Sequence, residues 1–140
     1  MPGVDLWTTT QTVRRALDDA EALLRSSGPA GSVDRTHTAL HGYLQNMAAT
    51  AGLAYKPDAS MTALLKLLRR SHPGLASVGP RGQDTDKILN ACGAILDAML
   101  PVRNQASLAH PNEDLLGEKE ALLVISVGRS LLSYLDARLR

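Results

Sequence analysis

Residues 120–136 have the sequence EALLVISVGRSLLSYLD, and this stretch is the strongest indicator of the architecture. At 3.6 residues per turn, its apolar side chains spread over more than one side of a helix. So broad an apolar surface is typical of a helix at the centre of a bundle, or of one that also contacts a second chain. We therefore predict a central helix from about residue 117 to 139, with apolar positions at Ala121, Leu122, Val124, Ile125, Val127, Leu131, Leu132, Tyr134 and Leu135.

Helical periodicity continues through most of the preceding chain. Amphipathic patterns predict four earlier helices, at about residues 7–25, 32–51, 60–72 and 84–100. Ser32 is expected to cap the second helix, and Asp58 or Ser60 the third. Two stretches rich in glycine, proline or serine, 26–31 and 73–83, predict connections, the latter with one short helical turn around residues 75–78.

The fold class that these patterns predict is all-α. We expect an up-and-down bundle of about five helices with antiparallel neighbours. A chain of 140 residues suits one domain with a real core, so residues 1–140 are expected to form a single domain. Residues 1–31 would supply an N-terminal helix and a linker.

Composition limits the classes of function. Lys and Arg number 15 against 14 Asp and Glu, so any affinity for RNA must be local rather than a property of the whole surface. Four scattered aromatic rings and no Phe argue against a platform of stacked bases. One cysteine, Cys92, excludes an internal disulfide. No signal peptide or membrane-spanning run is recognised, so we expect a cytoplasmic protein without a membrane partner.

The densest group of chemically active side chains lies at residues 102–111, VRNQASLAHP. On a helix, Arg103 and His110 would fall on nearly the same face, about 10 Å apart along the axis. Ser107 would lie between them, and Asn104 one step round from Arg103. A guanidinium that binds a phosphate and an imidazole that moves a proton are sufficient to cleave an RNA phosphodiester by 2′-hydroxyl attack, without a metal or cofactor.

The spacing of Arg103-Asn104 and His110 resembles the motif of the HEPN superfamily, small all-helical domains that include many metal-independent endoribonucleases. The longer run from Arg103 to Asp136, with the earlier DRTHTALHGYL, is similar to the C-terminal domain of bacterial abortive-infection proteins, a HEPN-like group. The resemblance covers roughly residues 33–138. It implies an endoribonuclease of phage defence or toxin type, acting as a homodimer. In this sequence the histidine is followed by Pro111, where many relatives have glycine.

Two residues of the second predicted helix, Arg35 and His41, have two interpretations. The resemblance suggests that they border the motif and assist in binding phosphate or orienting the catalytic groups. The alternative is that His41 packs in the bundle with its ring bonded to a backbone carbonyl or an Asp. His37 and His41 have the i, i+4 spacing of metal ligands, but no third ligand accompanies them, and we predict no metal site.

Lys66, Arg69, Arg70 and His72 lie near the predicted end of the third helix. Cations stabilise the C-terminus of a helix, which is the simpler explanation of their position. A basic lip that guides RNA is the alternative.

For the whole protein, three functions remain open from the sequence. The leading hypothesis is the endoribonuclease, with RNA as substrate, Arg103, Asn104 and His110 as catalytic residues, and Ser107, Arg35 and His41 in support. The second is a non-catalytic dimerisation or sensing module of a defence protein, in which Arg103 and His110 are buried by partners such as Asp34, Asp97 or Glu120. The third is a phosphate- or nucleotide-binding module. Other domains or a cognate regulator would fit any of them.

Overall fold

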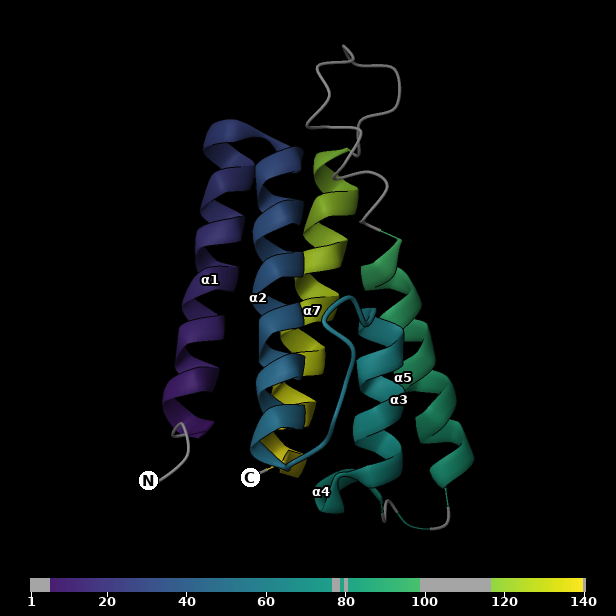
Figure 1. Ribbon diagram of the computed structural model, residues 1–140. Coiled ribbons are helices and arrows are strands. Elements are labelled where there is room, and N and C mark those ends of the chain that lie inside the picture. The colour runs from purple at the N-terminus through teal and green to yellow at the C-terminus, as the bar shows by residue number, and fades with distance from the viewer. Residues whose placement is uncertain (1–5, 77–78, 80, 99–116, 140) are drawn as a thin grey trace.

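The computed structural model describes residues 6–76, 79, 81–98 and 117–139. Within these residues every regular element is a helix, as the sequence patterns predicted. The helices form one bundle (Figure 1). They are α1 (Leu6–Ser27), α2 (Pro29–Thr50), α3 (Met61–Ser71), α4 (Pro73–Ala76), α5 (Gly82–Asp97) and α7 (Glu118–Leu139).

The connection between α1 and α2 is a single residue. Gly28 has φ 91°, a conformation that glycine adopts without steric cost, and it reverses the chain so that α1 and α2 lie antiparallel (Figure 1). Pro29 occupies the first turn of α2, where its missing N–H costs no hydrogen bond. The prediction that Ser32 caps this helix was wrong: its hydroxyl donates to the Pro29 carbonyl at 2.9 Å, inside the first turn.

The link between α2 and α3 is the exception to strict up-and-down order. Residues 51–60 run back along the bundle, so that α3 points in the same direction as α2 (Figure 1). Ten residues can span about 33 Å when extended, more than the length of α3, so the return is sterically easy. Ser60 caps α3 by accepting a hydrogen bond from the Ala63 N–H at 3.1 Å, which confirms one of the two predicted caps.

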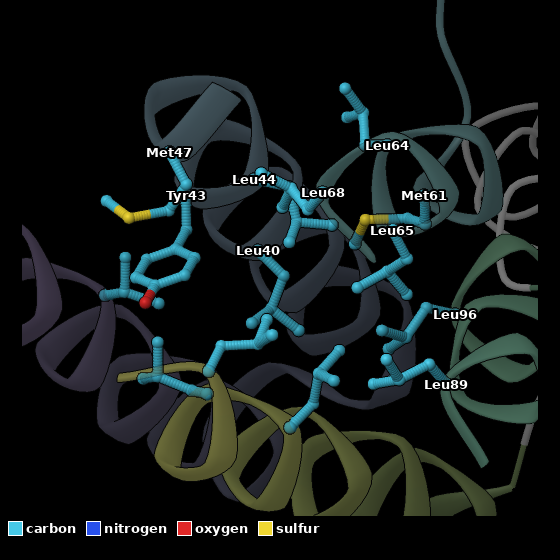
Figure 2. Packing of buried hydrophobic residues seen from close by; sticks show 14 of the residues in the cluster. Leu40, Tyr43, Leu44, Met47, Met61, Leu64, Leu65, Leu68, Leu89 and Leu96 are labelled. Carbon is cyan, nitrogen blue, oxygen red and sulfur yellow. The ribbon is translucent and has the colours of Figure 1, made fainter. Parts of the chain in front are cut away.

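The core consists mainly of leucine side chains, most of them from α2, α3, α5 and α7, and α1 adds Val13 and Leu17. Figure 2 shows Leu40 and Leu44 of α2 converging with Leu65, Leu89 and Leu96. The apolar face of α7 completes this cluster with Val124, Leu131, Leu132, Leu135 and Leu139. Because α7 also contacts α1 and α2, it is the central helix that its broad apolar surface predicted.

Two glycines allow close contact between helices. A Cβ at Gly128 of α7 would lie 2.7 Å from the Leu40 Cδ1 atom of α2. A Cβ at Gly93 of α5 would lie 2.8 Å from the Thr62 hydroxyl of α3. The first and last helices are joined by a buried hydrogen bond, in which the Thr10 hydroxyl donates to the Asp136 carboxylate at 2.9 Å. These contacts set the helix positions on which the surface sites depend.

Candidate functional site

The four motif residues Arg103, Asn104, Ser107 and His110 lie outside the described residues. Their place in the chain is between α5, which ends at Asp97, and α7, which begins at Glu118. These two helix ends lie at the same end of the bundle (Figure 1). The described residues therefore show only the two helix ends that flank residues 99–116, and the roles of the motif residues stay predictions.

Asp97, the last residue of α5, holds the start of α3. Its carboxylate accepts hydrogen bonds from the Met61 N–H at 2.9 Å and the Thr62 N–H at 3.0 Å. The Thr62 hydroxyl adds a third, at 2.7 Å. A carboxylate at a helix N-terminus also interacts favourably with the helix dipole. The sequence suggested Asp97 as one possible partner of Arg103, which lies outside the described residues; among the described residues, Asp97 accepts hydrogen bonds from these α3 groups.

Asp97→Ala should destabilise the fold by about 2 kcal/mol, because two N–H groups and one hydroxyl lose their acceptor in a partly buried place. Urea denaturation followed by circular dichroism measures the change. Asp97→Asn keeps an amide oxygen as acceptor and should lose less than the alanine variant. Equal stability of Asp97→Ala and the parent would show that the hydrogen bonds between Asp97 and the start of α3 contribute nothing to the stability of the fold.

Arg35 and His41 both lie on α2 but take part in different contacts. The Arg35 guanidinium forms an exposed ion pair with Asp19 of α1 at 3.3 Å. The Nε2 atom of His41 lies 2.7 Å from the Ala59 carbonyl oxygen, in the loop before α3. Six residues of a helix separate the two by about a third of a turn and 9 Å along the axis. The structure thus places them against α1 and the α2–α3 loop respectively, and the packing interpretation describes the observed contact of His41.

The two histidines of α2 are stacked. The rings of His37 and His41 have centroids 5.6 Å apart and an interplanar angle of 24°. Beside them is a hollow of about 450 Å³, whose lining includes Gln45 and Asp58. Among the residues that the structure describes, no three His, Cys, Asp or Glu side chains are grouped closely enough to hold a metal ion.

The cationic residues of α3 border a groove against α5. It has a volume of about 410 Å³, and we call it the α3–α5 groove; it is lined by Leu65, Lys66, Arg69, Arg70, Asp86, Leu89 and Asn90. The cations at the end of α3 are recognisable in the sequence, whereas Asp86 and Asn90 were not predicted as their neighbours. Their i, i+4 spacing on α5 was a signal that the two share one face.

Two other titratable groups are perturbed by burial. Burial lowers the pKa of His72, whose Nδ1 atom accepts the Gly74 N–H at 3.0 Å. A lowered pKa reduces its positive charge at neutral pH, so His72 adds little to the basic cluster. Burial raises the pKa of the Cys92 thiol, which makes the thiol less reactive and agrees with the absence of an assigned role.

None of the helices in the described ranges is both long and apolar enough to cross a bilayer. In a comparison with protein families, the model of the abortive-infection C-terminal group, described as a HEPN-like domain, matches residues 11–137. The match includes most of α1 and α7 and the whole motif segment. No curated protein and no solved structure matches the chain.

Proposed function

Because the chain belongs to the HEPN-like family of the abortive-infection C-terminal group, we propose that it is a metal-independent endoribonuclease of a phage-defence or toxin system. The observation that carries this proposal is the presence of Arg103, Asn104 and His110, in motif order and spacing, inside the matched residues. Membership of the family itself supports a defence-type domain. The proposal of RNA cleavage depends on the side chains of Arg103, Asn104 and His110.

In the proposed reaction, the 2′-hydroxyl of a ribose attacks the neighbouring phosphorus. The bond to the 5′-oxygen of the next nucleotide breaks, leaving a 2′,3′-cyclic phosphate and a free 5′-hydroxyl. His110 transfers the proton that this exchange requires, and Arg103 stabilises the charge that develops on the phosphate. Asn104 and Ser107 orient the reacting groups, with Arg35 and His41 in support.

A homodimer is part of the proposal, since the family resemblance implies it. Exposed apolar side chains on α5 support association: Ile88 is 63% exposed and Ile95 36% exposed. Ala91 and Ala98 share the same strip, with spacings of three and four residues. Leu123, near the start of α7, is 58% exposed. Side chains of this kind are unusual on a monomer surface when they gather in one strip.

The test is an RNA-cleavage assay with the purified protein in excess EDTA, using several unstructured and structured RNAs. Cleavage that persists in EDTA and leaves 2′,3′-cyclic phosphate ends is the expected result. Products with 3′-hydroxyl ends, or activity that EDTA abolishes, would contradict the proposed mechanism.

A non-catalytic dimerisation module of a defence protein is the second candidate, and the exposed α5 strip favours it. No cleavage of any RNA, combined with a stable dimer in sedimentation experiments, would select this function. Cleavage with the predicted ends would reject it.

A further inference from the structure

The α3–α5 groove holds more positive charge than the protein as a whole. Lys66, Arg69 and Arg70 face a single carboxylate, that of Asp86. The formal charge of the full chain is only +1. The groove therefore concentrates, in one place, the local charge that a near-neutral protein needs in order to bind a polyanion.

Arg69 is fixed in position, whereas the other two cations are available. The Arg69 Nε atom lies 2.8 Å from the Asp86 carboxylate, and an Nη1–H group donates to the Leu75 carbonyl at 2.9 Å. Lys66 and Arg70 are exposed, and neither forms an ion pair with a described residue. They are four residues apart on α3, so their side chains emerge from the same face with Cβ atoms about 5–6 Å apart.

Stabilisation of the α3 C-terminus accounts for only part of this arrangement, because Arg69 and Arg70 lie in the last turn of α3 but Lys66 does not. Lys66 lies five residues before Ser71, the last residue of α3, and thus outside the final turn where the helix dipole acts. The guanidinium of Arg69 donates to the Leu75 carbonyl, beyond the end of α3. The helix dipole therefore leaves the position of Lys66 unexplained.

The shape of the groove suits an extended polymer as ligand. A second hollow, of about 500 Å³, shares Arg69 and Asp86 with it and continues to Arg81, Gln83 and Asp84 at the start of α5, where Arg81 is paired with Asp84. In Figure 1 α3 and α5 lie side by side. Leu65 and Leu89, which line the groove, belong to the core cluster that packs between these helices (Figure 2). Asn90 adds an amide that can both donate and accept hydrogen bonds. Two adjoining hollows, with the exposed cations Lys66 and Arg70 at one of them, match neighbouring phosphates of a polymer better than one small anion.

We propose that the α3–α5 groove binds the phosphate backbone of single-stranded RNA, with Lys66 and Arg70 contacting phosphates and the Asp86-held Arg69 shaping the channel. RNA as the ligand rests on the proposed function, but the groove contains none of the residues assigned to cleavage. Aromatic side chains do not line it, so binding should depend on charge and show little base preference.

Binding can be measured apart from cleavage with a fluorescent 2′-O-methyl RNA oligonucleotide, which has no 2′-hydroxyl to attack. Fluorescence anisotropy at several salt concentrations gives the affinity and its salt dependence. Lys66→Ala/Arg70→Ala should weaken binding about tenfold at moderate salt and reduce the salt slope by about 1.4, as for two lost phosphate contacts on a single strand. Lys66→Arg should bind as the parent does.

The matched control is Arg14→Ala/Arg15→Ala, which removes the same charge from exposed positions of α1 and should change affinity less than twofold. Equal loss in both double variants, no binding by the parent, or displacement of RNA by poly-glutamate of equal charge would overturn the proposal. If binding depends on the groove but natural RNA is not cleaved, the groove proposal is supported and the ribonuclease proposal is rejected. If RNA is cleaved but Lys66→Ala/Arg70→Ala binds as the parent does, only the groove proposal is rejected.

Discussion

Replacing His110 by alanine should lower the rate of RNA cleavage by a factor of about 10² to 10⁴, because a positioned acid or base contributes that much to proton transfer. Arg103→Ala should cost about 10² to 10³, since the charge on the phosphate loses its stabilising partner. Both values come from the cleavage rate of a short RNA in EDTA, measured with the protein in saturating excess over the RNA. Each variant must retain the helical circular dichroism and the oligomeric state of the parent.

Arg103→Lys separates charge from geometry. Lysine keeps the positive charge but lacks the planar fork that binds two phosphate oxygens, so this variant should recover only part of the lost rate. Arg14→Ala, at an exposed site on α1, serves as the arginine control and should cleave at the parental rate. A His110→Ala variant within threefold of the parent would remove His110 from the mechanism.

Leu40→Ala should reduce the free energy of unfolding by about 3 kcal/mol, the cost of deleting a buried leucine and leaving a cavity. Leu40 is 2% exposed, and it lies between α2 and α7 in the centre of the bundle. Its Cδ1 atom occupies the space beside Gly128. Urea denaturation, with the slope checked for two-state behaviour, measures the loss.

The contact with Gly128 makes the interpretation specific. Gly128→Ala alone should destabilise the protein, because its new methyl group would meet the Leu40 side chain. In the Leu40→Ala background the same methyl group enters the cavity. The double variant should therefore lose less unfolding free energy than the sum of the losses in the two single variants. Strict additivity would contradict the close contact of α2 and α7. Gln11→Ala, at an exposed position of α1, is the control and should change stability by about 0.5 kcal/mol or less.

Much of the fold could be predicted because helices are local structures. The apolar spacing of residues 120–136 identified the central helix, and the start of α3 was expected at Asp58 or Ser60, of which Ser60 is the cap. The same reasoning misplaced the start of α2. Six residues rich in glycine and serine predicted a linker, yet one glycine with positive φ makes the turn, and Pro29 begins the helix at once. Periodicity marks a helix better than it marks its ends.

The candidate site divides in the same way. Arg103, Asn104, Ser107 and His110 were recognised from spacing and family resemblance, and they lie outside the described residues. For Arg35 and His41, the sequence left two interpretations open. Their observed partners, Asp19 and the Ala59 carbonyl, are 16 and 18 residues away, beyond the reach of any helical repeat.

By itself, then, the sequence determined the all-α class, the central helix and the chemistry available near residues 102–111, because each depends on neighbours within a few turns of one helix. Only the tertiary structure decided that Asp97 holds the start of α3 and that Asp86 fixes Arg69 at the α3–α5 groove. Asp97 and Met61 are 36 residues apart in the sequence, and Asp86 and Arg69 are 17 residues apart. They meet because burial of the leucine core brings α3 and α5 together, and a periodic pattern contains no information on which helix will be the neighbour.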